Sequence, residues 1–461
     1  TLSSSSAASD VYKRQIIGAA FFVIIGFVSF SYADVAENRQ SSLSLEEAVS
    51  LAFKNNKDIL IQENEIKAAR AKILGAKGEF LPKVNINGGY THRDSVMSLG
   101  ASQASNLDKD LGVFVGYEDE KRVGVSVEQP IFEGGMNIAN LKQANLKLKV
   151  QEENLRSRKL AVEFETQRLY YGILLAYETE RIAQELLDQA QSHYEIVKSK
   201  FEEGVSSKFD LLQSKVQVSK VVPELVRAQN AKELIIAEFK KLIGLGRKGF
   251  IVLQDELSYS FIDLNEERFL EIANGNRPEL IMKSLEIDIG QQGILVAKSI
   301  GMPRVNAGFN YDYKSDDTSD MFNTRHNNWN VGISISIPLF DGFSAKAKVD
   351  EAKARYAQAE LSKADTDEIV ALEVRRGALN LVQAQSIIES QKDSIEEARE
   401  AVTIAEVRYD NGGGTNLDVL DTQVSLSQIE KNLSQGIYDY LIGNAYLNRT
   451  IGVSIFKEET R

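Results

Sequence analysis

Long helical patterns dominate the chain. Residues 343–410 hold no proline and one interior glycine, Gly377, and are rich in Ala, Glu, Gln and Lys, which favours one continuous helix. At a rise of 1.5 Å per residue, that helix is roughly 100 Å long. In residues 415–451, apolar side chains recur every three or four positions, the spacing of a coiled-coil seam. They are Leu426, Ile429, Leu433, Ile437, Tyr440, Leu447 and Ile451.

The two halves of the chain repeat each other. Pro82 and Pro303 align at an offset of 221, and Asp210 and Asp418 align at an offset of 208 that holds for over a hundred residues. A register kept over that distance indicates an internal duplication. We therefore expect two structural repeats, a linker between them and a short tail. Their ranges are 43–243 and 264–451 for the repeats, 244–263 for the linker and 452–461 for the tail.

Each repeat is predicted to contain two helices, two strands and a helical hairpin. The expected elements of the first repeat are helices at about 44–56 and 58–79, strands 83–92 and 122–131, and hairpin helices 135–202 and 206–243. Those of the second are helices 264–274 and 278–299, strands 304–313 and 329–339, and hairpin helices 343–410 and 415–451. The fold class is thus mostly α with a β minority.

The sequence pattern of the predicted strands fits two classes of protein, soluble proteins and membrane barrels. Residues 331–337 alternate Val or Ile with Gly or Ser, as do both half-buried soluble strands and membrane barrel walls. We expect each strand pair to be an isolated hairpin, which is only marginally stable in water. Four strands cannot close a barrel, since the smallest membrane barrels have about eight, and lipid does not tolerate unpaired edges. Three chains would supply twelve strands, so a trimer is predicted.

The N-terminus has the pattern of an export signal. Lys13 and Arg14 precede an apolar run from Ile16 to Phe30 that ends in Ser-Tyr-Ala, as in a secretory signal peptide cleaved after Ala33. The run is too short for a membrane-spanning helix, which needs about 20 residues. We therefore expect residues 1–33 to be a signal peptide whose first twelve residues are not native.

Composition excludes several classes of protein. The 461 residues include no cysteine and three scattered histidines, and the net charge is −12. Thiolate metal sites and cysteine nucleophiles are therefore excluded, and the negative charge argues against a nucleic-acid partner. No triad, carboxylate pair or histidine cluster points to catalysis. Gly412–Gly414 lack the Lys-Ser/Thr of a phosphate-binding loop, so neither an enzyme nor a cofactor is expected.

The stretch "RYDNGGGTNLDVLD" (408–421) holds the main candidate site. Its three glycines are expected to turn the chain between two helices, as Gly204 does at the matching place in the first repeat. Asp418 and Asp421 are three residues apart and share a helix face. Acids in a first turn stabilise the helix dipole, so these two are either caps or carboxylates that face a pore.

These features together resemble the TolC-type outer-membrane efflux proteins. The resemblance covers residues 43–452 and rests on four stretches, "LSLEEAVSLAFKNN" (43–56), "RPEL" (277–280), "ISIPLFDGF" (335–343) and "RYDNGGGTNLDVLDTQ" (408–423). It implies a homotrimer with a twelve-stranded barrel in outer-membrane lipid and a helical barrel across the periplasm. It also implies an export duct that carries small molecules or secreted proteins to the cell exterior. The duct would dock, through a periplasmic adaptor, onto an inner-membrane pump. The alternative is a periplasmic coiled-coil structural or adaptor protein without a barrel.

The resemblance also assigns roles to residues at the glycine turns. Asp418 and Asp421 match aspartates that narrow the periplasmic entrance, and they form a candidate cation site. Tyr409 and Asp210 match gating contacts, whose arginine partner is replaced here by Gly414. Both turns match adaptor-docking tips, made up of Gly204, Gly412, Gly413 and Gly414.

A first prediction concerns assembly. Because four strands leave unpaired edges that lipid does not tolerate, the exported chain should run as an SDS-resistant trimer in the outer-membrane fraction. Gel electrophoresis of fractionated envelopes, with and without boiling, measures this. A folded monomer in the soluble periplasm would contradict the barrel interpretation.

Overall fold

A computed structural model describes residues 42–95, 97–99, 113–115, 118–246, 251–316 and 327–454. The predicted signal peptide and most of the predicted tail lie outside these residues. Residues 43–249 and 253–461 form one body, and the account below concerns its described part. None of the helices in those ranges is both long enough and apolar enough to cross a membrane.

The body contains the predicted elements in the predicted order. The first half holds α2 (Leu45–Asn55), α3 (Lys57–Gly78), β2 (Lys83–His92), β5 (Asp119–Glu133), α4 (Met136–Glu202) and α5 (Lys208–Leu242). The second half holds α6 (Glu266–Asn276), α7 (Pro278–Ser299), β7 (Arg304–Ser315), β8 (Asn327–Ser336), α8 (Ser344–Asp410) and α9 (Asn416–Thr450). Four short strands complete the set, β1 (Ser42–Leu43), β3 (Met97–Leu99), β4 (Val113–Val115) and β6 (Val252–Leu253).

The helices of the two halves agree in length. Corresponding helices have 11, 22, 67 and 35 residues in both halves. Left-handed backbone conformations also recur, since Gly204 and Gly412 have φ of 79° and 73°. At the start of α8, Phe343 takes a φ of 69° where the first half has Gly135 with a φ of 86°, although such a φ is unusual for a large side chain.

The strand bounds follow the prediction with three differences, one of which is that β7 covers 304–315 rather than 304–313. β8 covers 327–336 rather than 329–339, since Pro338 lacks the N–H that would extend the ladder. β5 is 15 residues long and continues through Pro130 because its ladder with β7 shifts register between Pro130 and Phe132. Such a bulge lets a strand continue past a residue that cannot donate.

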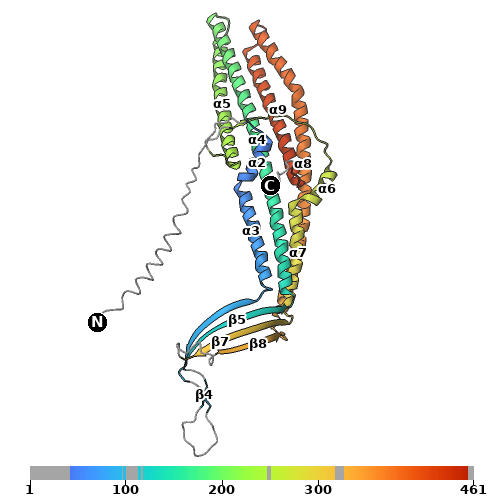
Figure 1. Ribbon diagram of the computed structural model, residues 1–461. Coiled ribbons are helices and arrows are strands. Elements are labelled where there is room, and N and C mark those ends of the chain that lie inside the picture. Colours follow the sequence, from blue (N-terminus) through green and yellow to red (C-terminus); the bar gives the residue numbers. More distant parts are fainter. Residues whose placement is uncertain are drawn as a thin grey trace, which may run out of the picture. The chain divides into compact units, whose positions relative to one another are not determined.

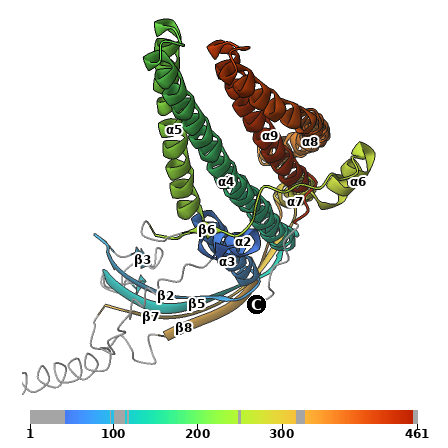
Figure 2. The same cartoon turned by 90° about the horizontal axis from the view of Figure 1, so that it is seen from above.

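The expectation of isolated hairpins was wrong. The four long strands form one antiparallel sheet in the order β2-β5-β7-β8, because β5 pairs with β7 from Lys121↔Ser315 to Glu133↔Arg304. Figure 1 and Figure 2 show the strands side by side, and the second view shows that the sheet is curved. Pairing the hairpins satisfies the backbone groups of two edges, and only the outer edges of β2 and β8 stay open.

The two faces of the sheet differ in polarity. Directly paired residues share a face, and one face carries Val84, Ile86, Tyr90, Val123, Val125, Val127, Phe309, Tyr311, Trp329, Val331, Ile333 and Ile335. The apolar side chains of β8 are 63–73% exposed. The opposite face is polar and includes a two-bond ion pair from Arg122 to Asp312, at 2.8 and 3.0 Å. Proteins surrounded only by water rarely expose so large an apolar face.

The helices pack as two hairpins. α4 packs along α5, α8 packs along α9, and α4 also contacts α9, so the order toward the turns is α5-α4-α9-α8. Figure 1 shows the two hairpins in green and red. α8 and α9 pack closely where Gly443 faces Leu381, a fully buried member of the core cluster of α6 to α9.

A second prediction uses this close packing. A Cβ at Gly443 would lie 2.9 Å from Leu381 Cδ2, so Gly443→Leu should overpack the core and destabilise the fold by about 2 kcal/mol. Gly75 on α3 has open space around it, and the matched control Gly75→Leu should be neutral or stabilising. Thermal unfolding followed by circular dichroism compares the two variants. Equal effects would mean that the α8–α9 core tolerates the added volume.

Candidate functional site

The two glycine turns have the same backbone geometry. Gly204 and Gly412 take left-handed conformations with open space around them, so the conformation rather than crowding requires glycine. At the second turn the Arg408 carbonyl accepts from the amides of Gly413 and Gly414, at 2.8 and 3.0 Å. The Arg408 guanidinium donates to the Gly413 carbonyl at 3.0 Å. A Cβ at Gly414 would lie 3.1 Å from Arg408 Cβ, so the turn fits glycine closely there.

Asp418 and Asp210 cap the helices that follow the turns. The Thr415 hydroxyl accepts from the Asp418 amide at 3.2 Å, and the Asp418 carboxylate accepts from the Thr415 amide at 2.9 Å. Ser207 and Asp210 form the same capping box at the start of α5. Hydrogen bonds from Thr415 hold the pKa of Asp418 below its usual value, so its carboxylate stays ionised. Asp418 and Asp210 therefore both take part in helix capping.

Asp421 differs from Asp418 in having no capping role. It is exposed on the next turn of α9, and no described side chain forms a hydrogen bond or ion pair with its carboxylate. The aligned position in the first half is Gln213. Of the two predicted constriction residues, Asp421 is thus the one whose charge is not used by the fold.

A buried polar cluster joins the two hairpins beside the turns. His193 of α4, Ser214 of α5 and Asn416 of α9 are 4%, 0% and 3% exposed. His193 Nε2 lies 2.7 Å from Asn416 Oδ1, which also accepts from the Ser214 hydroxyl at 3.1 Å. Asn416 Nδ2 donates to Gln213 Oε1 at 3.0 Å and to the Asp210 carbonyl at 3.4 Å. Asn416 therefore bonds to both helices of the other hairpin.

Tyr409 lies against this cluster. Its ring centroid is 5.1 Å from that of His193, and Lys200 Nζ lies 4.4 Å above the Tyr409 ring. Lys200 also pairs with the Asp410 carboxylate at 3.1 Å. The Asp210 carboxylate instead accepts from the Ser207 hydroxyl at 2.6 Å. Tyr409 and Asp210 thus belong to one cluster, joined through His193 and Asn416.

The sequence prediction missed His193, Asn416 and Lys200. Only one signal was available for His193: it continues the buried seam of α4 at intervals of three and four residues, after Ala183, Leu186 and Ala190 and before Val197. A polar residue in such a seam needs a buried partner. The partner is far away in sequence, so spacing alone does not reveal it.

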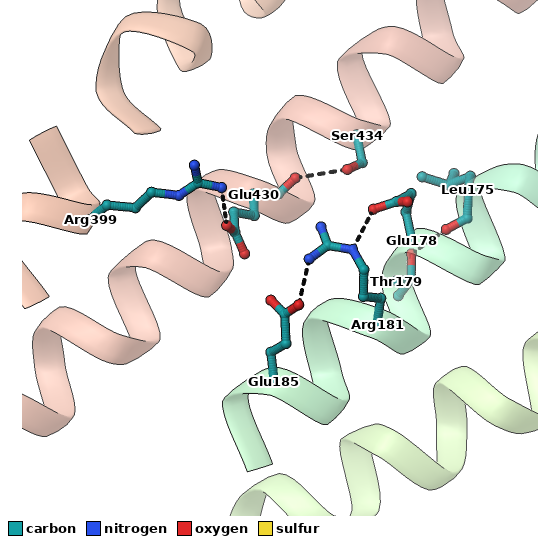
Figure 3. A network of polar contacts seen from close by, with 8 residues as sticks. All are labelled: Leu175, Glu178, Thr179, Arg181, Glu185, Arg399, Glu430 and Ser434. Carbon is teal, nitrogen blue, oxygen red and sulfur yellow. Dashed lines mark hydrogen bonds and ion pairs between the residues drawn. The ribbon is translucent and has the colours of Figure 1, made fainter. Parts of the chain in front are cut away.

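Farther from the turns, the polar contacts lie mostly within each hairpin. Figure 3 shows Arg181 of α4 bonded to Glu178 and Glu185 of the same helix, at 2.9 and 2.7 Å. It also shows Arg399 of α8 bonded at 3.2 Å to the buried Glu430 of α9. The described residues also include one ion pair between α9 and α5, from Lys431 to Glu224 at 3.2 Å. The cluster at the turns is thus the densest polar link between the hairpins.

The described residues of one copy of the chain do not form a metal site on their own. Among the described residues, no group of three or more His, Asp or Glu side chains could hold a metal ion. Asp418 and Asp421 supply two exposed carboxylates per chain, so a cation between them would need carboxylates from further copies.

The chain matches one protein family over most of its length. A profile described as outer membrane efflux protein matches residues 48–245 and 269–453. The outer membrane protein TolC of Vibrio cholerae is 22% identical over 442 residues, covering 94% of each chain. The alkaline protease secretion protein AprF of Pseudomonas aeruginosa is 20% identical, covering 89% of this chain and 85% of AprF.

Solved outer-membrane channels have the same fold. The channel OprN superposes with a TM-score of 0.76 at 19% identity, covering 89% of this chain and 90% of OprN. The open state of MtrE from Neisseria gonorrhoeae superposes with a TM-score of 0.75 at 16% identity, covering 90% of this chain and 91% of MtrE.

A third prediction distinguishes the two aspartates. Because Asp418 caps α9 and Asp421 does not, Asp418→Ala should speed amide hydrogen exchange in residues 415–420 about fivefold, and the control Asp421→Ala should not. Since the pKa of Asp418 is lowered in the fold, its contribution is present above the unfolded pKa and is lost as the pH falls through the folded pKa. Exchange followed by mass spectrometry measures both effects. Equal rates in the two variants would argue against the cap.

Proposed function

Since the chain belongs to the outer membrane efflux protein family, and is therefore an outer-membrane export duct, we propose that three copies form the duct. Their sheets close into one twelve-stranded barrel in the outer membrane, and their helices continue it as a tube through the periplasm. The glycine turns lie at the periplasmic mouth. The family is one of channels and not of enzymes.

The exposed apolar face of the sheet is the observation that carries this proposal. Its edge-strand residues Val84, Ile86 and Ile333 are 63%, 79% and 73% exposed, which would be costly in water. Lipid removes that cost. β2 and β8 have 10 residues each, the length of a tilted membrane strand, about 9–11 residues. The same face would not suit a soluble periplasmic adaptor.

Aromatic side chains lie at both ends of the apolar face. Tyr90, Tyr311 and Trp329 lie at the end away from the helices, with Tyr311 paired to Trp329. Phe340 and Phe343 stack edge to face, at 5.6 Å, where β8 leads into α8. Paired bands of this kind mark the two interfaces of a membrane barrel.

The open edges of the sheet and helices support a closed trimer. Pairing β8 of one copy with β2 of the next would satisfy every edge, as lipid requires. Exposed apolar side chains also follow the two flanking helices, Phe209, Leu212, Val216 and Val226 on α5 and Leu372, Leu379, Val382, Ile404 and Val407 on α8. In a ring of three copies, α5 of one chain would pack on α8 of its neighbour. The equal helix lengths support the proposed duplication.

Cargo would reach the duct through partners. One relative is named for protease secretion and another is a cation efflux system protein, so family members differ in what they export. We propose that a periplasmic adaptor docks on the two turns, at 204–207 and 411–415, and connects the duct to an inner-membrane pump. Val205 and Phe209, 75% and 73% exposed beside the first turn, would offer the adaptor an apolar contact.

The aspartates of α9 would narrow the mouth. Three copies of Asp418 and Asp421 would place six carboxylates around one axis, which favours cations. Asp421 would contribute most to the attraction of cations, because the Asp418 carboxylate already accepts a hydrogen bond from the Thr415 amide. Tyr409, Asp210 and their cluster would hold the hairpins in the resting position.

A fourth prediction tests the duct and its constriction together. The trimer should conduct cations selectively in planar bilayers, and divalent cations on the periplasmic side should block it, because they bind carboxylate oxygens. Asp421→Asn should weaken the block about tenfold or more, and Asp418→Asn less. Trimers should persist because the N-cap residue of α9, Thr415, is unchanged in both variants.

The control for this experiment is Asp393→Asn, a similar change at an exposed residue of α8 far from the turn. It should leave the block unchanged. Unaltered block and selectivity in the double variant at 418 and 421 would place the constriction elsewhere. A chain that does not conduct would argue against the duct itself.

A further inference from the structure

His193 lies where the two hairpins meet. It belongs to α4, its ring packs against Tyr409 of α8, and its Nε2 contacts Asn416 at the first position of α9. Asn416 in turn contacts Gln213 and Ser214 of α5. Two buried side chains, His193 and Asn416, therefore connect all four helices at the tip.

The hydrogen bonds determine which form of His193 fits. Asn416 Nδ2 donates to two acceptors, Gln213 Oε1 and the Asp210 carbonyl, so its Oδ1 faces the histidine. His193 Nε2 must therefore carry a hydrogen and donate it. The neutral ring with its hydrogen on Nε2 satisfies this bond, and an acid-induced second proton on Nδ1 adds charge to a side chain that is 4% exposed.

The charges around His193 come from three of the four helices. Lys200 lies on the same helix, Glu406 and Asp410 lie on α8, and Asp210 on α5 has its carboxylate turned to Ser207. α9 contributes only the neutral Asn416 to the contact. Glu406 accepts from Gln423 at 3.1 Å and Asp410 pairs with Lys200, so both acids already have partners.

Burial is the largest influence on the ring. It lowers the pKa of His193 below its ordinary value of 6.5, and Lys200 adds to that effect, while Asn416, Glu406 and Asp410 oppose it. A group whose pKa is lowered in the fold contributes stability above the unfolded pKa and loses it as the pH falls through the folded pKa. His193 Nε2 can donate to Asn416 in either form of the ring, but the buried position favours the neutral ring, so acid favours exposure of His193 to water.

We propose that the His193–Asn416 pair is a latch that holds the two hairpins together at the tip, and that acidification of the periplasm releases it. The inference rests on the proposed duct, because release matters only if the hairpins surround a pore. Breaking the pair separates α9 from α4 and α5 beside the second turn, two turns or less from Asp421. The mouth then widens.

Single-channel recording tests the latch on the whole trimer. With about pH 7.5 and then about pH 5.5 on the periplasmic side, the wild-type resting conductance should rise about threefold or more as His193 gains a proton. His193→Gln keeps an amide donor for Asn416 and cannot be charged, so it should stay at the low conductance at both pH values. The matched control His92→Gln changes a histidine of β2 and should keep the rise.

A second variant should reverse the direction in which the conductance changes with pH. Asn416→Asp removes the donor to Gln213 and the Asp210 carbonyl but gives protonated His193 a carboxylate partner. Its conductance should be higher than that of the wild type at about pH 7.5 and should fall at about pH 5.5. Asn416→Asp also tests the latch if His193→Gln fails to assemble. A conductance of Asn416→Asp that rises in acid, as in the wild type, would overturn the proposal.

Other outcomes have equally definite meanings. A wild-type conductance that does not change with pH, or a rise that persists in His193→Gln, overturns the latch while leaving the duct intact. Absence of conductance in every variant at both pH values overturns the duct instead.

Discussion

The constraint on which the structure depends is that lipid offers no hydrogen bonds to a peptide group. The sheet has one continuous apolar face that is exposed and one polar face that carries the Arg122–Asp312 pair. Such a sheet is stable only where the apolar face meets hydrocarbon, and there its edges must be paired. In the proposed duct, a trimer closes the edges of β2 and β8, and this trimer would place the long helices around a common axis.

The helical hairpins meet a different constraint. Each has one partner hairpin within the chain, and apolar side chains of α5 and α8 remain exposed on the flanks. Within the chain, α8 and α9 are fixed by close packing at Gly443 and Leu381. Toward the turns this packing gives way to polar contacts, and the link between hairpins depends on His193, Asn416 and the Lys200–Asp410 pair. A link made of few polar contacts can be released without unfolding the helices.

The comparison of the two turns separates structural residues from functional ones. Ser207 and Asp210 form the same capping box as Thr415 and Asp418, so these four residues meet a need that any helix start has. Asp421 and Gln213 occupy aligned positions but differ in charge. Gln213 supports Asn416, whereas Asp421 is exposed and takes no part in the fold. The difference between the halves therefore supports the proposed role of Asp421 in the duct more than their similarity does.

The sequence by itself determined the local elements. Periodicity, prolines and glycines are local properties, and they placed β2 at 83–92, α7 at 278–299 and the turns at Gly204 and Gly412 where the structure has them. The offset between the halves also follows from sequence alone. Only the tertiary structure decided which strands pair and which side chains meet. The β5–β7 ladder and the His193–Asn416 contact join residues 171 or more positions apart. Such contacts depend on how whole helices and strands pack, which spacing along the chain does not encode.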